Sequence, residues 1–316
     1  MNHHDQKTYH HFITGGSGLI GTSLVQRLAE AGHSGTILSR KSSLPPSSQN
    51  TSFSLLQGDI RDASWCKHIK GHHTIINLAG FPLFQHRWNA KTKQLIQSSR
   101  IQGSHNIADY VLSQPPSERC KHLIQASAVG YYGTSLTEKF DESSPAGHDY
   151  LADVAQKWEQ QALRLKGAID KVTIMRIGIV LSTRGGMIKK VLPIFQKGLG
   201  GRLGSGKQWV SWIHIHDLTA ALYQACTDSH WQEGVYNLTS PHPVTNSQLT
   251  KALSKHLKLP AFFPVAKTFL KAVLGEGANY ITQGQYVIAS KDVQQKFHYQ
   301  YPHIDEALAH LIKTKN

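Results

Sequence analysis

A glycine-rich turn near the start of the chain constrains the fold more than any other feature. Strand-like residues Tyr9 to Thr14 precede Gly15-Gly16-Ser17-Gly18-Leu19-Ile20-Gly21, and a helix-like stretch, Leu19 to Ala31, follows. The glycines fit both GxGxxG and GxxGxxG. Between a strand and a helix they permit a tight turn, close approach of the backbone to a pyrophosphate, and close packing of the helix on the strand. Free N–H groups at the start of the helix then face the phosphates. The turn therefore predicts dinucleotide binding rather than only a change of chain direction.

Apolar strand-like stretches alternate with helix-like stretches through the first half of the chain. This alternation is typical of an α/β fold with a parallel, doubly wound sheet of Rossmann type. We expect strands at Thr36 to Ser39, Phe53 to Leu56, Thr74 to Leu78, His122 to Gln125 and Val172 to Val180, and helices at Trp88 to Leu112 and Leu151 to Leu165.

The second half of the chain has a different pattern, in which helical periodicity dominates after Pro241. The predicted organisation is a Rossmann domain over residues 1–180, to which 209–240 return, and a smaller, mainly helical substrate lobe over 181–208 and 241–316. We expect strands at Val210 to Ile215 and Val235 to Leu238, and helices at Asp217 to Cys226, Ser247 to Leu257, Val265 to Leu274 and Ile304 to Lys313.

The residues after the second predicted strand decide which dinucleotide fits. An acid about 20 residues beyond the glycines would bind the ribose 2′-hydroxyl of NAD. This chain instead has Leu38-Ser39-Arg40-Lys41 there. Arg40 has a forked guanidinium suited to a 2′-phosphate, and Ser39 adds a hydroxyl. The alternative is a solvated arginine at a strand end. We expect the cofactor to be NADP(H).

Several motifs together resemble the extended short-chain dehydrogenases/reductases, and more closely an atypical, epimerase-like subgroup of them. The resemblance implies an oxidoreductase or epimerase-like activity on a small molecule. The motifs cover nearly the whole chain: Thr14 to Gly21, Asn77 to Gly80, Ser98-Ser99-Arg100, Ala126 to Gly133, Trp158-Glu159, Arg176 to Leu181, Gly204 to Ile215 and Pro243 to Asn246.

The resemblance also implies roles for residues at the matching positions. Gly58-Asp59-Ile60 would hold the adenine, the loop from Asn77 to Gly80 would lie beside the ribose, and Arg176 to Val180 would form a wall near the nicotinamide. His216 departs from the subgroup, which usually has an acid before Asp217. The implied cofactor set is Gly15, Ser17, Gly18, Leu19, Ile20, Gly21, Ser39, Arg40, Asp59, Ile60, Leu78, Ala79, Gly80, Arg100, Ser127, Arg176, Ile179 and Val180.

The Tyr-x-x-x-Lys pair that normally transfers protons in this superfamily is absent, because none of the eleven tyrosines has a lysine four residues later. Tyr150 lies near the expected place, but Lys157 is seven residues on, roughly 10 Å along a helix. The remaining catalytic candidates are Ser127, Tyr131 and Tyr132. Ser127 either polarises a substrate carbonyl or only bonds backbone or cofactor. The two tyrosines either supply a phenol or pack in the core.

The charge balance favours anionic partners. Lysines and arginines total 34 against 20 acids, a formal net charge of +14. The basic residues are scattered and no nucleic-acid-binding motif occurs, so we expect no nucleic-acid partner. The glycines from Gly198 to Gly206 lack the spacing of a phosphate-binding loop. We expect them to form a mobile loop over the substrate pocket, with Lys197, Arg202 and Lys207 available for an anion.

Other classes of protein are disfavoured by what the sequence lacks. No uncharged apolar run of about 18 residues occurs, so we expect no membrane partner. Three widely spaced cysteines without CxxC fit a cytoplasmic protein. His214 and His216 would share one face of a strand, but further ligands are missing, so we expect structural histidines and no metal. The function is then either small-molecule enzymology or, as the alternative, a non-catalytic NADP(H)-binding sensor or scaffold.

Overall fold

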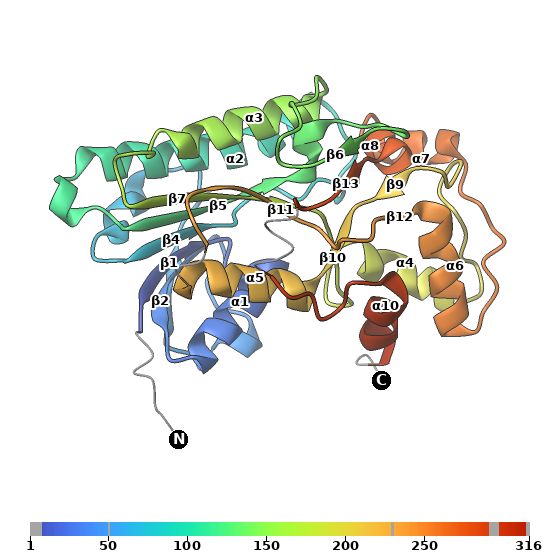
Figure 1. Ribbon diagram of the computed structural model, residues 1–316, viewed down its shortest axis with the longest axis horizontal. Helices are drawn as coiled ribbons and strands as arrows, with labels where there is room; N and C mark the ends of the chain where they lie inside the picture. Colours follow the sequence, from blue (N-terminus) through green and yellow to red (C-terminus); the bar gives the residue numbers. More distant parts are fainter. Residues whose placement is uncertain (1–7, 50, 229–230, 291–296, 314–316) are drawn as a thin grey trace.

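A seven-stranded parallel sheet forms the centre of the computed structural model, which describes residues 8–49, 51–228, 231–290 and 297–313 (Figure 1). The strand order is β11-β7-β5-β4-β1-β2-β3, and every neighbouring pair runs parallel. The α/β, doubly wound sheet predicted from the sequence is therefore confirmed. The strands are β1 (His10–Thr14), β2 (Ser34–Ser39), β3 (Phe53–Gln57), β4 (Thr74–Asn77), β5 (His122–Ala128), β7 (Lys171–Ile177) and β11 (Gly234–Leu238).

Helices cover both faces of the sheet. α1 (Leu19–Glu30) and α5 (Ile215–Thr227) pack together on one face, and α2 (Ala90–Ser113) and α3 (Tyr150–Leu163) on the other (Figure 1). Apolar residues at helical spacing produce this packing. In α1, for example, Leu24 and Leu28 are fully buried in the same apolar cluster as Ile13 of β1. Short 3₁₀ helices are η1 (Pro46–Ser48), η2 (Ser64–Ile69), η3 (Pro116–Glu118) and η4 (Val129–Tyr132).

Two predicted strands are each divided in the structure. The expected strand from Val172 to Val180 breaks at Gly178, after which β8 (Ile179–Leu181) leaves the sheet and pairs with β10 (Trp212–His214). A Cβ on Gly178 would lie 2.6 Å from the carbonyl oxygen of Ser211, so only glycine permits this crossing. The expected strand from Val210 to Ile215 is likewise split into β9 (Trp209–Val210) and β10. Ser211 lies between them, and its hydroxyl bonds to the backbone of residues 285 and 287.

Much of the C-terminal part packs around a separate apolar core. α4 (Gly186–Gln196), α6 (Asn246–Leu257) and α10 (Ile304–Lys313) supply Leu192, Leu253 and Leu308 to it. The sequence patterns did not indicate α4. The remaining elements are α7 (Lys267–Leu274), α8 (Ala278–Gln283), β6 (Lys139–Phe140) paired with β13 (Tyr286–Val287), and β12 (Val244–Thr245) paired with β9.

Candidate functional site

The carboxyl ends of the parallel strands meet at one edge of the sheet, where most of the predicted site residues lie. Gly15 follows β1, Ser39 ends β2, and residues 78–80 follow β4. Ser127 of β5 and Arg176 of β7 are paired in the sheet register. The strand order reverses between β1 and β4, and open α/β sheets bind ligands in the crevice at such a point.

The turn after β1 packs so closely that two of its glycines leave no room for a side chain. Gly15 has a φ of +69°, and a Cβ there would lie 2.8 Å from the backbone nitrogen of Ala79. A Cβ on Gly21 would collide with the carbonyl oxygen of Gly15. Gly15 therefore allows the turn to approach the loop after β4, and Gly21 allows α1 to approach the turn.

The beginning of α1 is open to an anion. Gly18 is the N-cap, and no side chain caps this helix end. The first turn, Leu19-Ile20-Gly21, contains no acid, and Gly18 is exposed. The N–H groups of this turn and the positive end of the helix dipole are therefore available to a phosphate group.

The end of β2 meets the turn through two hydroxyl groups. Ser39 Oγ lies 2.7 Å from Ser17 Oγ. The neighbouring Arg40 is exposed, and its guanidinium makes no hydrogen bond or ion pair with any residue in the described ranges. A guanidinium without a hydrogen bond, on the residue that follows this hydroxyl pair, is suited to binding a further phosphate.

The two residues expected at the adenine, Asp59 and Ile60, have different surroundings. Arg61 donates to the Asp59 carboxylate from Nε at 3.0 Å and from Nη2 at 2.7 Å. These bonds hold the pKa of Asp59 down at about 2. Ile60 is buried, and Asn106 of α2 donates to its carbonyl oxygen at 3.2 Å. The Asp59 carboxylate is therefore paired with Arg61, and the charge of Arg40 attracts it without a hydrogen bond or ion pair.

A buried polar network holds the loop after β4. Thr14 Oγ1 donates to Asn77 Oδ1 at 2.6 Å. Asn77 Nδ2 donates in turn to Ser104 Oγ at 2.8 Å and to Gln125 Oε1 at 2.9 Å. These bonds join β1, β4, β5 and α2, so the loop carrying residues 78–80 starts from a fixed position beside Gly15.

Arg100 of α2 hydrogen-bonds to backbone carbonyl groups, one of them just after the 78–80 loop, and not to a carboxylate. Its Nη1 donates to the carbonyl oxygens of Phe81 and Ile96, both at 3.1 Å. A Cβ on Gly80 would lie 3.0 Å from its Nη2. Burial lowers the pKa of Arg100 to about 10. No carboxylate among the described residues pairs with this desolvated cation, so an anion bound nearby would stabilise it.

At the ends of β5 and β7, Ser127 belongs to a buried network centred on the carboxylate of Glu159. Ser127 Oγ donates to Glu159 Oε1 at 2.5 Å. Arg176 donates to the same carboxylate from Nε at 2.9 Å and from Nη2 at 2.8 Å. All three side chains are buried, and the two-pronged geometry offsets the cost of removing both charges from water. Sequence reasoning assigned no role to Glu159, which comes from α3.

Tyr131 and Tyr132 both contact Arg176, but their hydroxyls differ. Tyr132 accepts a hydrogen bond from Arg176 Nη1 at 2.9 Å and donates to Asn237 Oδ1 at 2.8 Å. Burial raises the pKa of Tyr132 to about 12. The Tyr131 ring stacks on the Arg176 guanidinium at 3.3 Å, and its hydroxyl has no partner within the described ranges. Tyr131 is only partly buried, so its phenol is the one that remains able to donate a proton.

Tyr150 and Lys157 of α3 are occupied by other partners. Tyr150 donates its hydroxyl to the carbonyl oxygen of Lys93 at 2.5 Å, and burial raises its pKa to about 12. Lys157 pairs with Asp153 at 2.8 Å on the helix surface. These two side chains therefore do not replace the missing tyrosine–lysine pair.

His214 and His216 do not share a strand face, so that expectation is wrong. His214 is the last residue of β10 and the N-cap of α5, where its Nδ1 accepts the N–H of His216 at 3.0 Å. His216 already lies in the first turn of α5, because the strand ends earlier than predicted. In the described part of the chain, no group of three or more His, Cys, Asp and Glu side chains is placed to hold a metal. No helix in that part is long and apolar enough to cross a membrane.

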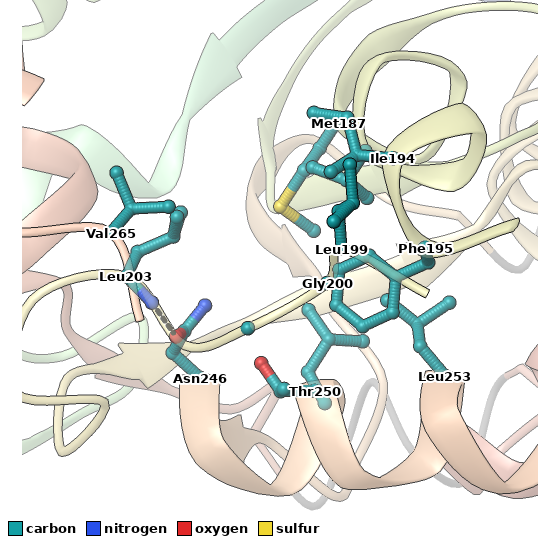
Figure 2. A pocket seen from close by; sticks show the side chains of 13 residues that line it. Met187, Ile194, Phe195, Leu199, Gly200, Leu203, Asn246, Thr250, Leu253 and Val265 are labelled. Carbon is teal, nitrogen blue, oxygen red and sulfur yellow. Dashed lines mark hydrogen bonds between the residues drawn. The ribbon is translucent and has the colours of Figure 1, made fainter. Parts of the chain in front are cut away.

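An apolar cavity of about 60 Å³ lies between α4, α6 and residues 199–203 (Figure 2). Met187 and Phe195 line it from α4, and Thr250 from α6. Asn246 Oδ1 accepts the N–H of Leu203 at 2.8 Å. The glycine-rich segment that we expected over the substrate pocket is therefore attached to α6 and to residues 263–265.

Similarity to known protein families and proteins covers most of the chain. The model of the NAD dependent epimerase/dehydratase family matches residues 11–239, and a domain of unknown function (DUF1731) matches residues 265–311. The epimerase family protein SDR39U1 homolog, chloroplastic, of Arabidopsis thaliana is 38% identical over 300 residues, covering 94% of this chain and 84% of that protein. Epimerase family protein YfhF of Bacillus subtilis is 34% identical over 304 residues, covering 96% and 98%.

A solved structure has the same architecture. The crystal structure of human epimerase family protein SDR39U1 (isoform 2) with NADPH superposes with a TM-score of 0.84 at 28% identity. The superposition covers 96% of this chain and 99% of the human chain.

Proposed function

This chain belongs to the NAD-dependent epimerase/dehydratase family, and on that premise we propose that it is an NADP(H)-binding, epimerase-like oxidoreductase acting on a small molecule. The observation that carries the proposal is the exposed Arg40, which follows Ser39 at the end of β2 and whose guanidinium makes no hydrogen bond or ion pair with the described residues. No acid stands there to bind a ribose 2′-hydroxyl. The human relative, whose crystal structure was solved with NADPH, supports the same choice.

The residues at the carboxyl edge of the sheet fit such a dinucleotide. The open N-terminus of α1 would bind the pyrophosphate, Arg40 would bind the 2′-phosphate, and Arg100 would add positive charge. When bound, the cofactor supplies or accepts a hydride. In this proposal residues 1–180 with 209–240 hold the cofactor, and residues 181–208 with 241–316 hold the substrate. The remaining proposed contacts are Asp59, Ile60, Leu78, Ala79, Gly80, Ile179 and Val180.

We assign proton transfer to Tyr131 and substrate orientation to Ser127. The Tyr131 phenol has no partner among the described residues and lies against the Arg176 guanidinium. Ser127 Oγ can turn from Glu159 towards a substrate oxygen, while Arg176 keeps the carboxylate paired. Tyr132 is a positioning residue in this scheme, because its hydroxyl holds Arg176 beneath the Tyr131 ring. General acid catalysis of this kind contributes roughly 10²- to 10⁴-fold.

The second candidate is a non-catalytic NADP(H)-binding sensor or scaffold. One observation favours it. The Ser127 proton is donated to a buried carboxylate at 2.5 Å, so in this state it is not directed towards a substrate. Cofactor binding alone would require only the glycine turn, Arg40 and the loop after β4.

A panel of small carbonyl compounds with NADPH tests the two candidates. We expect slow oxidation of NADPH by at least one compound, and we expect Tyr131→Phe and Ser127→Ala each to lower kcat at least about tenfold. NADPH affinity, measured separately by calorimetry, should change little in Tyr131→Phe. The matched control is Tyr110→Phe on α2, which removes a phenol whose hydroxyl bonds to the carbonyl of Lys67.

The outcomes separate the candidates. Turnover that survives both substitutions would remove Tyr131 and Ser127 from the mechanism. Tight NADPH binding without turnover of any compound would favour the sensor or scaffold.

A further inference from the structure

A second cavity, a cleft of about 380 Å³, lies beside α6 and is separate from the residues assigned to the cofactor. In Figure 1, α6 is drawn at the opposite end of the molecule from β2. The cleft is lined by Arg202, Ser247, Thr250, Lys251, Ser254 and Phe262, among others. Of these residues, the sequence pointed only to Arg202 as a candidate ligand for an anion.

Two paired segments of chain contribute residues both to this cleft and to the apolar cavity of Figure 2. The N–H of Phe263 donates to the carbonyl of Gly200 at 3.0 Å, and the N–H of Val265 donates to that of Arg202 at 2.8 Å. Successive residues of an extended chain face opposite sides. Leu203 and Val265 accordingly line the apolar cavity, whereas Arg202 lines the cleft.

Three of the four polar side chains of α6 that line the cleft lack partners among the described residues. Ser247, Thr250, Lys251 and Ser254 are three or four residues apart and therefore share one helix face. Only Ser254 uses its hydroxyl internally, donating to the carbonyl of Leu259 at 2.6 Å. The side chains of Ser247, Thr250 and Lys251 bond to no residue in the described ranges, although Thr250 is only 9% exposed. Hydroxyl and ammonium groups without protein partners are available to bind a ligand or water.

The charged side chains that line the cleft, Arg202 and Lys251, are both positive. The carboxylate of Asp305 on α10 bonds to Lys255 and His256. The segments that build the cleft contain no acid between Asp170 and Asp217, and none between Glu233 and Glu276. Arg202 and Lys251 are exposed, and no carboxylate among the described residues pairs with either one. This local potential attracts anions. Phe262 adds an aromatic ring that is 81% exposed at the same cleft.

We propose that this cleft binds a small phosphate monoester that carries an aromatic or similarly planar apolar group. Arg202 and Lys251 hold the phosphate, the hydroxyls of Ser247 and Thr250 donate hydrogen bonds to it, and the ring of Phe262 stacks on the apolar group. The cleft lies within the segments proposed to hold the substrate, residues 181–208 and 241–316. None of its residues belongs to the cofactor or proton-transfer sets, so a failure of the oxidoreductase proposal would leave this binding test unaffected.

Titration of the full chain with phenyl phosphate and with inorganic phosphate, followed by NMR or calorimetry, tests the site. We expect saturable binding with one phenyl phosphate per chain, tighter than inorganic phosphate. Arg202→Gln and Lys251→Gln should each weaken both ligands at least about fivefold. Phe262→Ala should remove the preference for phenyl phosphate and leave inorganic phosphate unchanged. Thermal unfolding of each variant checks that it is folded.

Control variants separate this site from other sources of anion binding. Lys207→Gln and Arg40→Ala remove cations that do not line the cleft and should leave phenyl phosphate affinity unchanged. Equal losses in Lys207→Gln and Arg202→Gln would overturn the proposal in favour of diffuse charge. Loss only in Arg40→Ala would place the ligand at the cofactor edge and also overturn the proposal.

Sedimentation with phosphatidic acid vesicles tests whether the phosphate belongs to a lipid. Vesicle binding that requires Arg202, without phenyl phosphate binding, would contradict the small-molecule ligand.

Discussion

At the scale of single residues, the cofactor preference depends on the exposed guanidinium of Arg40. Arg40→Ala should lower NADPH affinity about ten- to a hundredfold and leave NADH affinity nearly unchanged, because only the 2′-phosphate meets this group. A hydrogen bond to a charged group contributes about 1.5–3 kcal/mol. Calorimetric titration with both cofactors measures the difference, and Lys41→Ala is the matched control. Equal affinity of the wild type for NADPH and NADH would contradict the assignment.

Two glycines of the first turn should respond differently to the same substitution. A Cβ on Gly18 lies 3.1 Å from the carbonyl oxygen of Gly15, which a small shift relieves, and faces the expected pyrophosphate. Gly18→Val should therefore fold and lose at least about tenfold in NADPH affinity. A Cβ on Gly21 collides with the backbone of Gly15 and Gly16, so Gly21→Val should destabilise the fold itself. Thermal unfolding and NADPH titration measure the two effects. A folded Gly18→Val chain with unchanged NADPH affinity would disprove the placement.

At the scale of elements, the amino edge of the sheet carries a group of buried histidines. His11 of β1 is fully buried, and neither ring nitrogen has a partner in the described part of the chain. Burial, followed by the charges of His33, His73, His10 and His72, lowers the pKa of His11 to about 3. The histidine is therefore neutral in the folded protein over most of the acid range.

This burial predicts how stability depends on pH. The pKa of His11 is 6.5 in the unfolded chain and about 3 in the folded chain. Between these values the imidazole binds a proton only when the chain is unfolded. Stability is thus full above pH 6.5 and falls towards pH 3. His11→Phe should reduce the slope of unfolding free energy against pH by about 1.4 kcal/mol per unit between roughly pH 5.5 and 4. Urea unfolding measures the slope, with exposed His86→Phe as control. Parallel curves for wild type and His11→Phe would refute the expectation.

At the scale of the whole molecule, Asp217 joins the sheet region to the C-terminal core. Its buried carboxylate, on α5, accepts the N–H groups of Gln300 and Tyr301, both at 3.0 Å. The segment around these residues packs Phe297 into the core of the sheet, and α10 follows it into the second core. This carboxylate therefore contributes to the attachment of the last helix, together with the packing of α10 in the second core.

Asp217→Asn should loosen this attachment. The amide offers one acceptor oxygen where two N–H groups need partners, so we expect a loss of about 1–3 kcal/mol in unfolding free energy. Hydrogen exchange should accelerate in α10 more than in β1. Glu306→Gln, on the exposed surface of α10, is the control. Equal acceleration in α10 and β1 would show that Asp217 supports global stability rather than this contact.

The amino-acid sequence by itself determined the cofactor-binding architecture, and the predicted resemblance to an epimerase-like family is confirmed. These features were predictable because their causes are local. A Cβ on Gly21 would meet the backbone of Gly15 and Gly16, only a few residues away. The residue after β2 is identified by its distance in sequence from the glycine turn. The alternation of strands and helices follows from apolar spacing within each segment.

Tertiary structure alone decided which distant side chains meet. Glu159 reaches Ser127 and Arg176 only because α3 packs across the register of β5 and β7. Lys251 and Arg202 line the same cleft only because residues 200–204 pair with 263–265 beside α6. The break at Gly178 depends on the approach of Ser211 from another strand. Such contacts arise from desolvation and packing between segments far apart in sequence, and local spacing carries no information about them.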